Sequence, residues 1–220
     1  RPGAAPVSEF DETLRVVPLI EAIRKVSDIP ISIDTMKPGV ARAAIKAGAT
    51  IWNDVAALRF SPDAPEVATE LGCEIVLMHM LGEPGTMQDA PRYDDVVAEV
   101  EAFLLARAST AMAAGVAREK IWLDPGIGFG KTLEHNLALL AALPRFVALG
   151  YPILLGASRK RFIAGIDPSA QEATDRLGGS IAAHLVGAEA GVAAVRVHDV
   201  RETVQALDVF QAVRGAVPLA

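Results

Sequence analysis

The stretch ISIDTMKPGVARAAIKAGATIWNDV, residues 31–55, places one helical run between two short apolar runs and decides the fold class. Residues 31–35 and 50–55 have the β-branched, apolar composition of buried strands. Residues 38–47 begin with a proline and end at Gly48, which is typical of a helix. This strand–helix–strand order predicts a parallel sheet that is covered by helices.

The same alternation continues in both directions from this unit. A helix is expected near Ser8, where S-E-F-D has the form of a capping box, and Pro18 is expected to kink or restart it. Further strands are predicted at residues 74–79, 121–124, 153–155 and 193–199, and further helices at residues 66–71, 94–114, 137–149, 174–190 and 201–213. The pattern therefore contains six strands and seven helices, with a helix first.

A doubly wound sheet and a (β/α)8 barrel both fit this count. The barrel is favoured because polar, chemically competent residues follow every strand instead of gathering at one crevice. They are Asp34, Asn53, His79, Asp124, Ser158 and His198. We therefore predict an α/β fold, a (β/α)8 barrel without its first two strands and their loops, as a single domain spanning residues 1–220.

Composition excludes several classes of protein. A hydrophobic content of 51% is typical of a well-packed globular domain, and a single cysteine, Cys73, excludes a disulfide-stapled module. The formal net charge of −6 argues against a protein that coats nucleic acid. No apolar run reaches the length of a membrane helix, so we expect a soluble, cytoplasmic protein with no membrane partner.

The segment DPGIGFGK, residues 124–131, is the most specific motif. Its glycines allow the backbone to approach a ligand closely, and Phe129 is suited to lie against a flat ring. The spacing does not match a phosphate-binding P-loop, and an ordinary strand-to-helix turn remains the alternative. Asp34 is suited to accept hydrogen bonds from a heterocycle or to cap the next helix, and Asn53 is suited to read a ring edge or to form a turn.

Basic residues cluster at the ends of the last two strands. GASRKR, residues 156–161, places three cations after one strand, where barrels commonly bind phosphate, although a solvated charge run is the alternative. Arg196 and His198 are two residues apart in a strand and therefore share a face. No spacing typical of a metal site or of a catalytic serine is present, and His79 fits a ligand or a core histidine equally well. These groups suit a flat polar heterocycle that carries an anionic leaving group.

In this order the motifs ISIDT, IWNDV, VLMHM, DPGIGFGK, GASRK and RVHDV, together with RPGA at the N-terminus, resemble the dihydropteroate synthase family of pterin-binding barrels. The resemblance covers nearly the whole chain. It implies a transferase that condenses 6-hydroxymethyl-7,8-dihydropterin diphosphate with 4-aminobenzoate, releases diphosphate and uses Mg2+. It also suggests a homodimer formed through the last helices.

The resemblance further implies roles for individual residues, with Asp34 and Lys160 as the catalytic pair. The expected pterin-binding residues are Asp34, Asn53, Met78, Asp124, Gly156, Lys160 and Arg196. Arg1, Arg196 and His198 are expected to bind the diphosphate, and Phe129 and Ser158 to lie on the aminobenzoate side.

One departure from the family pattern bears on the metal. The family's first strand carries an N-V-T-P-D-S-F-type loop with the Mg2+-binding asparagine, and neither this loop nor the second strand ending in G-G-E-S-T is among the 220 residues. No metal ligand is therefore expected here. A methyltetrahydrofolate:corrinoid methyltransferase and a non-catalytic pterin-binding barrel remain the alternatives.

Overall fold

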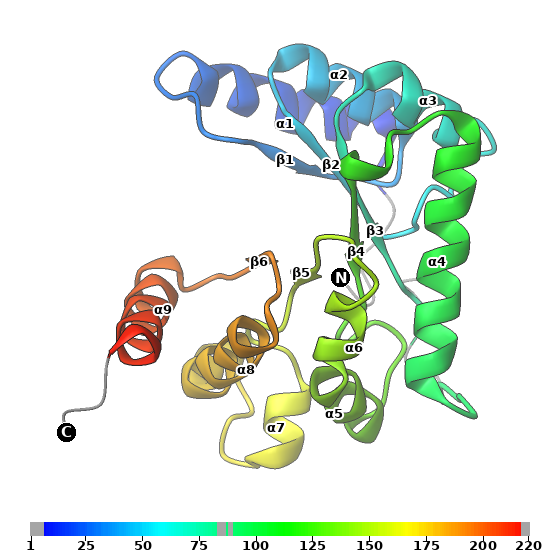
Figure 1. Cartoon of the computed structure of the whole chain (residues 1–220). Helices are drawn as coiled ribbons and strands as arrows, with labels where there is room; N and C mark the ends of the chain where they lie inside the picture. The colour runs from blue at the N-terminus through cyan, green and yellow to red at the C-terminus, as the bar shows by residue number, and fades with distance from the viewer. Residues whose placement is uncertain (1–6, 83–86, 88–89, 217–220) are drawn as a thin grey trace.

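The structure is a computed structural model that describes residues 7–82, 87 and 90–216, in which strands and helices alternate along the chain (Figure 1). The elements are α1 (Glu9–Arg24), β1 (Ser32–Asp34), α2 (Pro38–Ala47), β2 (Ile51–Asp54), α3 (Ala64–Leu71), β3 (Glu74–Met78), α4 (Val96–Ala114), η1 (Arg118–Lys120), β4 (Ile121–Asp124), α5 (Leu133–Ala141), α6 (Leu143–Val147), β5 (Leu154–Leu155), α7 (Phe162–Ile166), η2 (Ala173–Arg176), α8 (Leu177–Ala190), β6 (Ala194–Val195) and α9 (Val200–Gly215). Across the described ranges, no helix is both long and apolar enough to span a bilayer.

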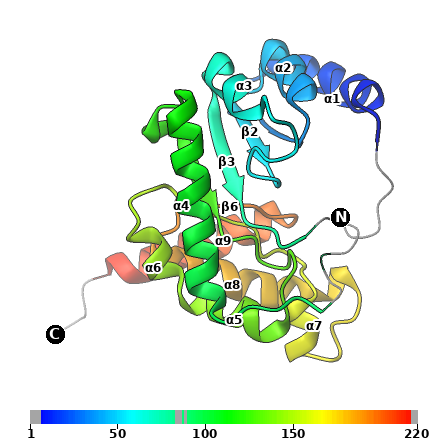
Figure 2. The same ribbon diagram turned by 90° about the vertical axis from the view of Figure 1, so that its right-hand side faces the viewer.

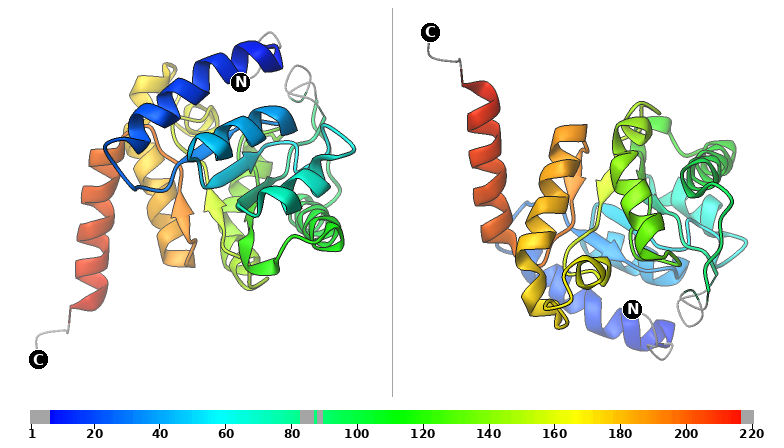
Figure 3. Two further views of the ribbon diagram at one scale, coloured as in Figure 1. Left: turned by 90° about the horizontal axis from the view of Figure 1, so that it is seen from above. Right: turned by 90° about the horizontal axis from the view of Figure 1, so that it is seen from below.

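All six strands that the sequence predicts are present in the described residues, and they are parallel. Strands β1 to β4 pair in chain order, β5 pairs with β6, and a single bridge from Leu123 to Ile153 joins the two groups. The helices lie on the outside of this row (Figure 3). Because parallel strands end at the same edge, the polar residues that follow them are carried to one side of the molecule.

The hydrophobic core lies between the strands and the surrounding helices. Figure 2 shows α4 running beside β3, and Leu77 of β3, Leu104 and Ala108 of α4 are all fully buried. Trp52 is also fully buried, and its indole N–H donates to the carbonyl oxygen of Thr35 at 2.8 Å. This bond matters for position, because it ties the end of β2 to the end of β1, where Asp34 and Asn53 lie opposite each other.

Several local predictions are wrong or incomplete. The last strand, predicted over residues 193–199, is only Ala194–Val195, so Arg196 and His198 follow the strand instead of lying in it. The helix predicted over residues 137–149 is two helices, α5 and α6, because Pro144 lacks an N–H and its ring clashes with the preceding turn. Pro18, in contrast, lies inside the single helix α1, which starts at the expected cap, where Ser8 Oγ accepts from the amide of Asp11. The short helix α7 was not expected, and the segment predicted as a helix over residues 174–190 begins as the 3-10 turn η2.

Candidate functional site

The candidate site lies at the carboxyl ends of the strands, where the sequence placed its polar residues. The strand register sets Asp34 beside Asn53 and Met78 beside Asp124. Met78 is buried and packs in a small apolar cluster with Phe129. Four strands thus deliver two carboxylates, one amide and one apolar wall to the same edge of the sheet.

Asn53 is buried, and its side-chain oxygen has no hydrogen-bond partner among the described residues. A buried acceptor without a partner costs free energy, so this oxygen is suited to a ligand N–H. The neighbouring Asp54 turns away from it and accepts from the amides of Ala56 at 2.8 Å and Leu58 at 2.7 Å. Burial raises the pKa of Asp54 to about 6, against these two hydrogen bonds. Asp54 therefore shapes the loop after β2, and Asn53 is the residue that faces the site.

Asp124, which is buried, and Lys160, which is half-buried, form the charged inner part of the site. One oxygen of Asp124 accepts from the amide of Gly126 at 2.7 Å, and burial raises the pKa of this carboxyl while the nearby Lys160 ammonium opposes the shift. Burial also lowers the pKa of Lys160 to about 8, with Asp124 opposing. The Lys160 ammonium donates to the carbonyl of Ile127 and lies 4.4 Å from the centre of the Phe129 ring. A carboxylate and a cation are thus both held by contacts with the loop after β4.

Gly156 lies among these charged groups. A Cβ at this position would lie 4.0 Å from each of Asp124 Oδ2, Lys160 Nζ and Arg196 Cβ. Three of the predicted pterin-binding residues therefore lie around a fourth, Gly156, whose missing side chain keeps the space between them open.

The two ends of the strand row meet at an exposed ion pair. Arg196, just after β6, donates to Asp34, at the end of β1, with 2.6 Å between Nη2 and Oδ2. The two side chains are 59% and 43% exposed. Both groups are therefore in place at the site and accessible to a ligand.

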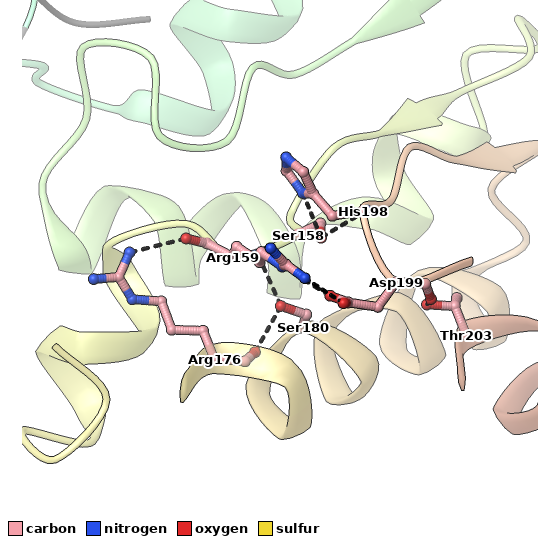
Figure 4. Close-up of polar contacts among 7 residues, drawn as sticks. All are labelled: Ser158, Arg159, Arg176, Ser180, His198, Asp199 and Thr203. Carbon is pink, nitrogen blue, oxygen red and sulfur yellow. Dashed lines mark hydrogen bonds and ion pairs between the residues drawn. The ribbon is translucent and has the colours of Figure 1, made fainter. Parts of the chain in front are cut away.

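Figure 4 shows the polar contacts behind the last strands. His198 contacts Ser158, whose Oγ lies 2.9 Å from His198 Nδ1 and accepts from the His198 amide at 3.2 Å. Arg159 binds Asp199 through both carboxylate oxygens. The structure therefore engages Arg159, one of the three consecutive cations, in an ion pair within the protein. Arg1 lies outside the described residues.

One residue at the site was not singled out by the sequence. Lys131, the last residue of the DPGIGFGK segment, is buried, and its ammonium lies 2.9 Å from Nδ1 of His79. His79 is itself buried against Phe103 in an edge-to-face contact, so it is a core histidine. The signal available in the sequence was the lysine at the end of a glycine-rich loop. Within the described part of the chain, no three His, Cys, Asp or Glu side chains gather to form a possible metal site.

Comparisons with known proteins agree with this arrangement. The family of pterin binding enzymes matches residues 1–198. The dihydropteroate synthase of Escherichia coli (strain K12) is 47% identical over 219 residues, which cover 98% of this chain and 76% of that protein.

Two solved structures are similar over the whole fold. Xanthomonas albilineans dihydropteroate synthase with 4-aminobenzoic acid has a TM-score of 0.92 at 47% identity, covering 99% of this chain and 77% of that one. The same enzyme in complex with 7,8-dihydropteroate has a TM-score of 0.89 at 45% identity, covering 96% and 77%. These similarities confirm the predicted barrel fold and favour the synthase over the corrinoid methyltransferase and the non-catalytic barrel. The chain belongs to the pterin-binding enzymes and, among them, to the dihydropteroate synthase family.

Proposed function

We propose that this dihydropteroate synthase binds its pterin substrate between the buried residues of β2 to β5 and the exposed pair Asp34 and Arg196. The observation that carries the proposal is the ring of groups around Gly156, where Asp124, Lys160 and Arg196 all approach within van der Waals distance of one open position. Carboxylates pair with ring N–H donors, and ammonium donors pair with ring acceptors. These groups together suit a flat heterocycle that has both.

The remaining pterin contacts follow from burial and chemistry. Asn53 offers an unsatisfied buried oxygen, and Met78 supplies an apolar wall beside the slot. For Arg196 we propose that its planar, exposed guanidinium stacks on the ring and contacts phosphate. His198 is exposed on the same side and, with Arg1, is proposed to hold the diphosphate.

We place 4-aminobenzoate on the side of Phe129 and Ser158. The Phe129 ring is fixed beneath the Lys160 ammonium, so it offers one flat face of defined orientation. Ser158 is held by His198 and thereby connects this side of the site to the proposed diphosphate side.

The reaction is a substitution at the exocyclic methylene carbon of the pterin. The bond from this carbon to the diphosphate oxygen breaks, the amine nitrogen of 4-aminobenzoate forms the new C–N bond, and the amine loses a proton. Positive charge develops on the methylene carbon as diphosphate departs. Asp34 is suited to stabilise that charge, while Lys160, Arg196 and His198 favour binding of the pterin and of the anionic leaving group.

Turnover tests this assignment directly. The protein should release diphosphate only when pterin diphosphate and 4-aminobenzoate are both present, and Lys160→Ala should lose this activity while it remains folded. Diphosphate release no greater than in the Lys160→Ala control would refute the assignment. Binding of a corrinoid partner protein would support the methyltransferase, and calorimetry showing pterin but no aminobenzoate binding would support a non-catalytic barrel.

Magnesium dependence is part of the proposal because the family resemblance implies it. The described residues do not fit a Mg2+ site, since no group of three suitable side chains gathers there. We therefore assign no step of the reaction to the metal in this chain. Turnover measured with and without a chelator tests the dependence.

We also propose that residues 1–220 form one domain, that the protein acts in the cytoplasm, and that it is a homodimer. An apolar groove of about 600 Å³ between α5, α7 and α8 supports the dimer, and Leu137, Ile166 and Val186 on its lining are 42%, 59% and 46% exposed. Val186→Glu should shift sedimentation towards the monomer. Val26→Glu is the matched control, because Val26 is 84% exposed at the end of α1. A monomeric wild type would refute the dimer.

A further inference from the structure

Lys131 is a buried cation that binds backbone rather than a carboxylate. It is 4% exposed, and lysine is rarely buried to this extent without partners. Its ammonium lies 2.9 Å from His79 Nδ1, donates to the Phe129 carbonyl at 2.9 Å, and lies 3.4 Å from the His79 carbonyl. An ammonium group has three donors, and it meets three acceptors here.

The state of His79 supports this description. Burial, together with the charge of Lys131, lowers the pKa of His79 to about 3, so its ring is neutral. A neutral ring with its proton on Nε2 leaves Nδ1 free to accept from the ammonium. Lys131 therefore joins the end of β3, at His79, to the loop after β4, at Phe129.

This loop is packed so closely against the end of β3 that its position depends on such contacts. Gly126 has a φ of +68°, and a Cβ there would overlap the His79 carbonyl oxygen. Gly130 has a φ of +64°, and a Cβ there would lie 2.7 Å from the Leu81 carbonyl oxygen. Only glycine fits at either position. The backbone of the loop after β4 therefore packs directly against the backbone that follows β3. The Lys131 ammonium contacts both segments.

Phe129 is held from two sides as a result. The buried Lys131 ammonium binds its carbonyl, and the Lys160 ammonium lies 4.4 Å from the centre of its ring. In the described part of the chain, Lys131 forms no recorded hydrogen bond to the groups around Gly156 or to the exposed ion pair, although its charge interacts with those of Asp124 and Lys160. Its direct contacts are with the loop, so we expect its main effect on substrate to come from the position of the loop.

We propose that Lys131 is a positioning residue for 4-aminobenzoate: by tying the loop after β4 to the end of β3, it fixes the Phe129 ring against which the aminobenzoate ring lies. This inference rests on the proposed function for the placement of aminobenzoate beside Phe129. The proposal predicts a larger effect on aminobenzoate than on pterin, because the pterin contacts of Asn53 and Gly156 come from other segments of the chain.

The first test compares Lys131→Leu with Lys120→Leu. Lys120 is the matched control, because its ammonium also donates to a backbone carbonyl, that of Gly72, at the opposite ends of the strands. We expect Lys131→Leu to raise KM for 4-aminobenzoate about tenfold, the equivalent of one charged hydrogen bond, and to leave KM for pterin diphosphate within about twofold. Lys120→Leu should change neither. Equal changes in both KM values would overturn the proposal.

The second test needs no activity. Met78, Met80 and Met87 pack with Phe129, whereas Met36 and Met112 lie outside this cluster. The methionine methyl groups are labelled with 13C, and spectra are recorded at about pH 6, where Lys131 is charged. Lys131→Leu should move the Phe129 ring and therefore shift the resonances of the three clustered methionines. The resonances of Met36 and Met112 should stay in place. Unchanged clustered resonances would overturn the proposal.

Two further outcomes keep the inferences separate. If Lys131→Leu does not fold, Lys131→Arg replaces it, because a planar guanidinium cannot direct its donors at the same three acceptors. Unshifted resonances of the clustered methionines in folded Lys131→Arg would overturn the proposal. A wild type that binds pterin but no 4-aminobenzoate would refute the role of Phe129 in the proposed function. Shifted methionine resonances in Lys131→Leu, compared with that wild type, would still establish that Lys131 positions the ring.

Discussion

Replacing Gly156 by alanine is the sharpest test of the pterin slot, because the added methyl group meets the site and little else. The new Cβ would lie 4.0 Å from Asp124 Oδ2, Lys160 Nζ and Arg196 Cβ, which is ordinary van der Waals contact. Gly156 is not among the glycines with positive φ, so alanine fits its backbone. The fold should therefore accept the substitution.

The expected effects on stability and on binding differ in sign and size. A glycine-to-alanine change at a compatible backbone position stabilises a protein by about 0.4–1 kcal/mol through the unfolded chain. A methyl group inserted into a filled slot, in contrast, costs about 1–3 kcal/mol in the complex. Binding of the pterin substrate should consequently weaken about 5- to 150-fold.

Thermal unfolding and steady-state kinetics together decide the outcome. Gly156→Ala should unfold at or above the wild-type temperature and show the higher KM for pterin diphosphate. Gly126→Ala is the contrasting variant, because its methyl would overlap the His79 carbonyl and its φ is +68°, so it should unfold at a lower temperature. A folded Gly156→Ala with an unchanged KM would refute the slot that Asp124, Lys160 and Arg196 define.

Three further predictions concern charge. Asp34→Asn breaks an exposed ion pair, so the free energy of unfolding measured in urea should change by less than about 1 kcal/mol. Its affinity for pterin, measured by calorimetry, should fall about 10- to 100-fold because charged hydrogen bonds are lost. Arg196→Ala should weaken binding of pterin diphosphate more than binding of the pterin alcohol, and equal losses would exclude an anion contact. Burial lowers the pKa of Lys131 to about 7 and that of Lys160 to about 8, from 10.5 in the unfolded chain. Between the folded and unfolded pKa values the unfolded state binds more protons, so the free energy of unfolding should rise with pH from about 7 to about 10.5. Lys131→Leu should reduce that rise in urea titrations at successive pH values, and a slope equal to that of the wild type would contradict the assignment.

The positions of the strands and of most site residues could be predicted from the sequence because both depend on local pattern. An apolar run followed by a polar residue fixes the end of a strand, and parallel strands carry those ends to one edge. Asp34, Asn53 and Asp124 were found in this way. The break between α5 and α6 was missed because a proline stops a helix in one context, at Pro144, and is accommodated inside α1 in another, at Pro18.

Contacts across the chain could not be predicted in the same way. Ser158 and His198 are 40 residues apart, and nothing in either segment indicates that the hydroxyl meets the imidazole. Lys131 follows a glycine-rich loop, where a lysine can face either the ligand or the protein interior. The choice depends on whether buried acceptors are present beneath the loop, and those acceptors belong partly to His79, 52 residues earlier in the chain.

The burial of the site residues divides the site into a fixed part and an adjustable part. Asp124 is buried and held by the Gly126 amide, and the loop that carries Phe129 is held from inside by the buried Lys131, so a ligand meets this part already oriented and little reorganisation is needed. Asp34 and Arg196 are exposed and hold each other through a contact worth at most about 1 kcal/mol, which a charged substrate can replace at small cost. Substitutions in the fixed part should therefore change stability and binding together, whereas substitutions of the exposed pair should change binding alone. The pair also joins β1 to β6, so we expect substrate to replace this contact at the point where the first and last strands meet.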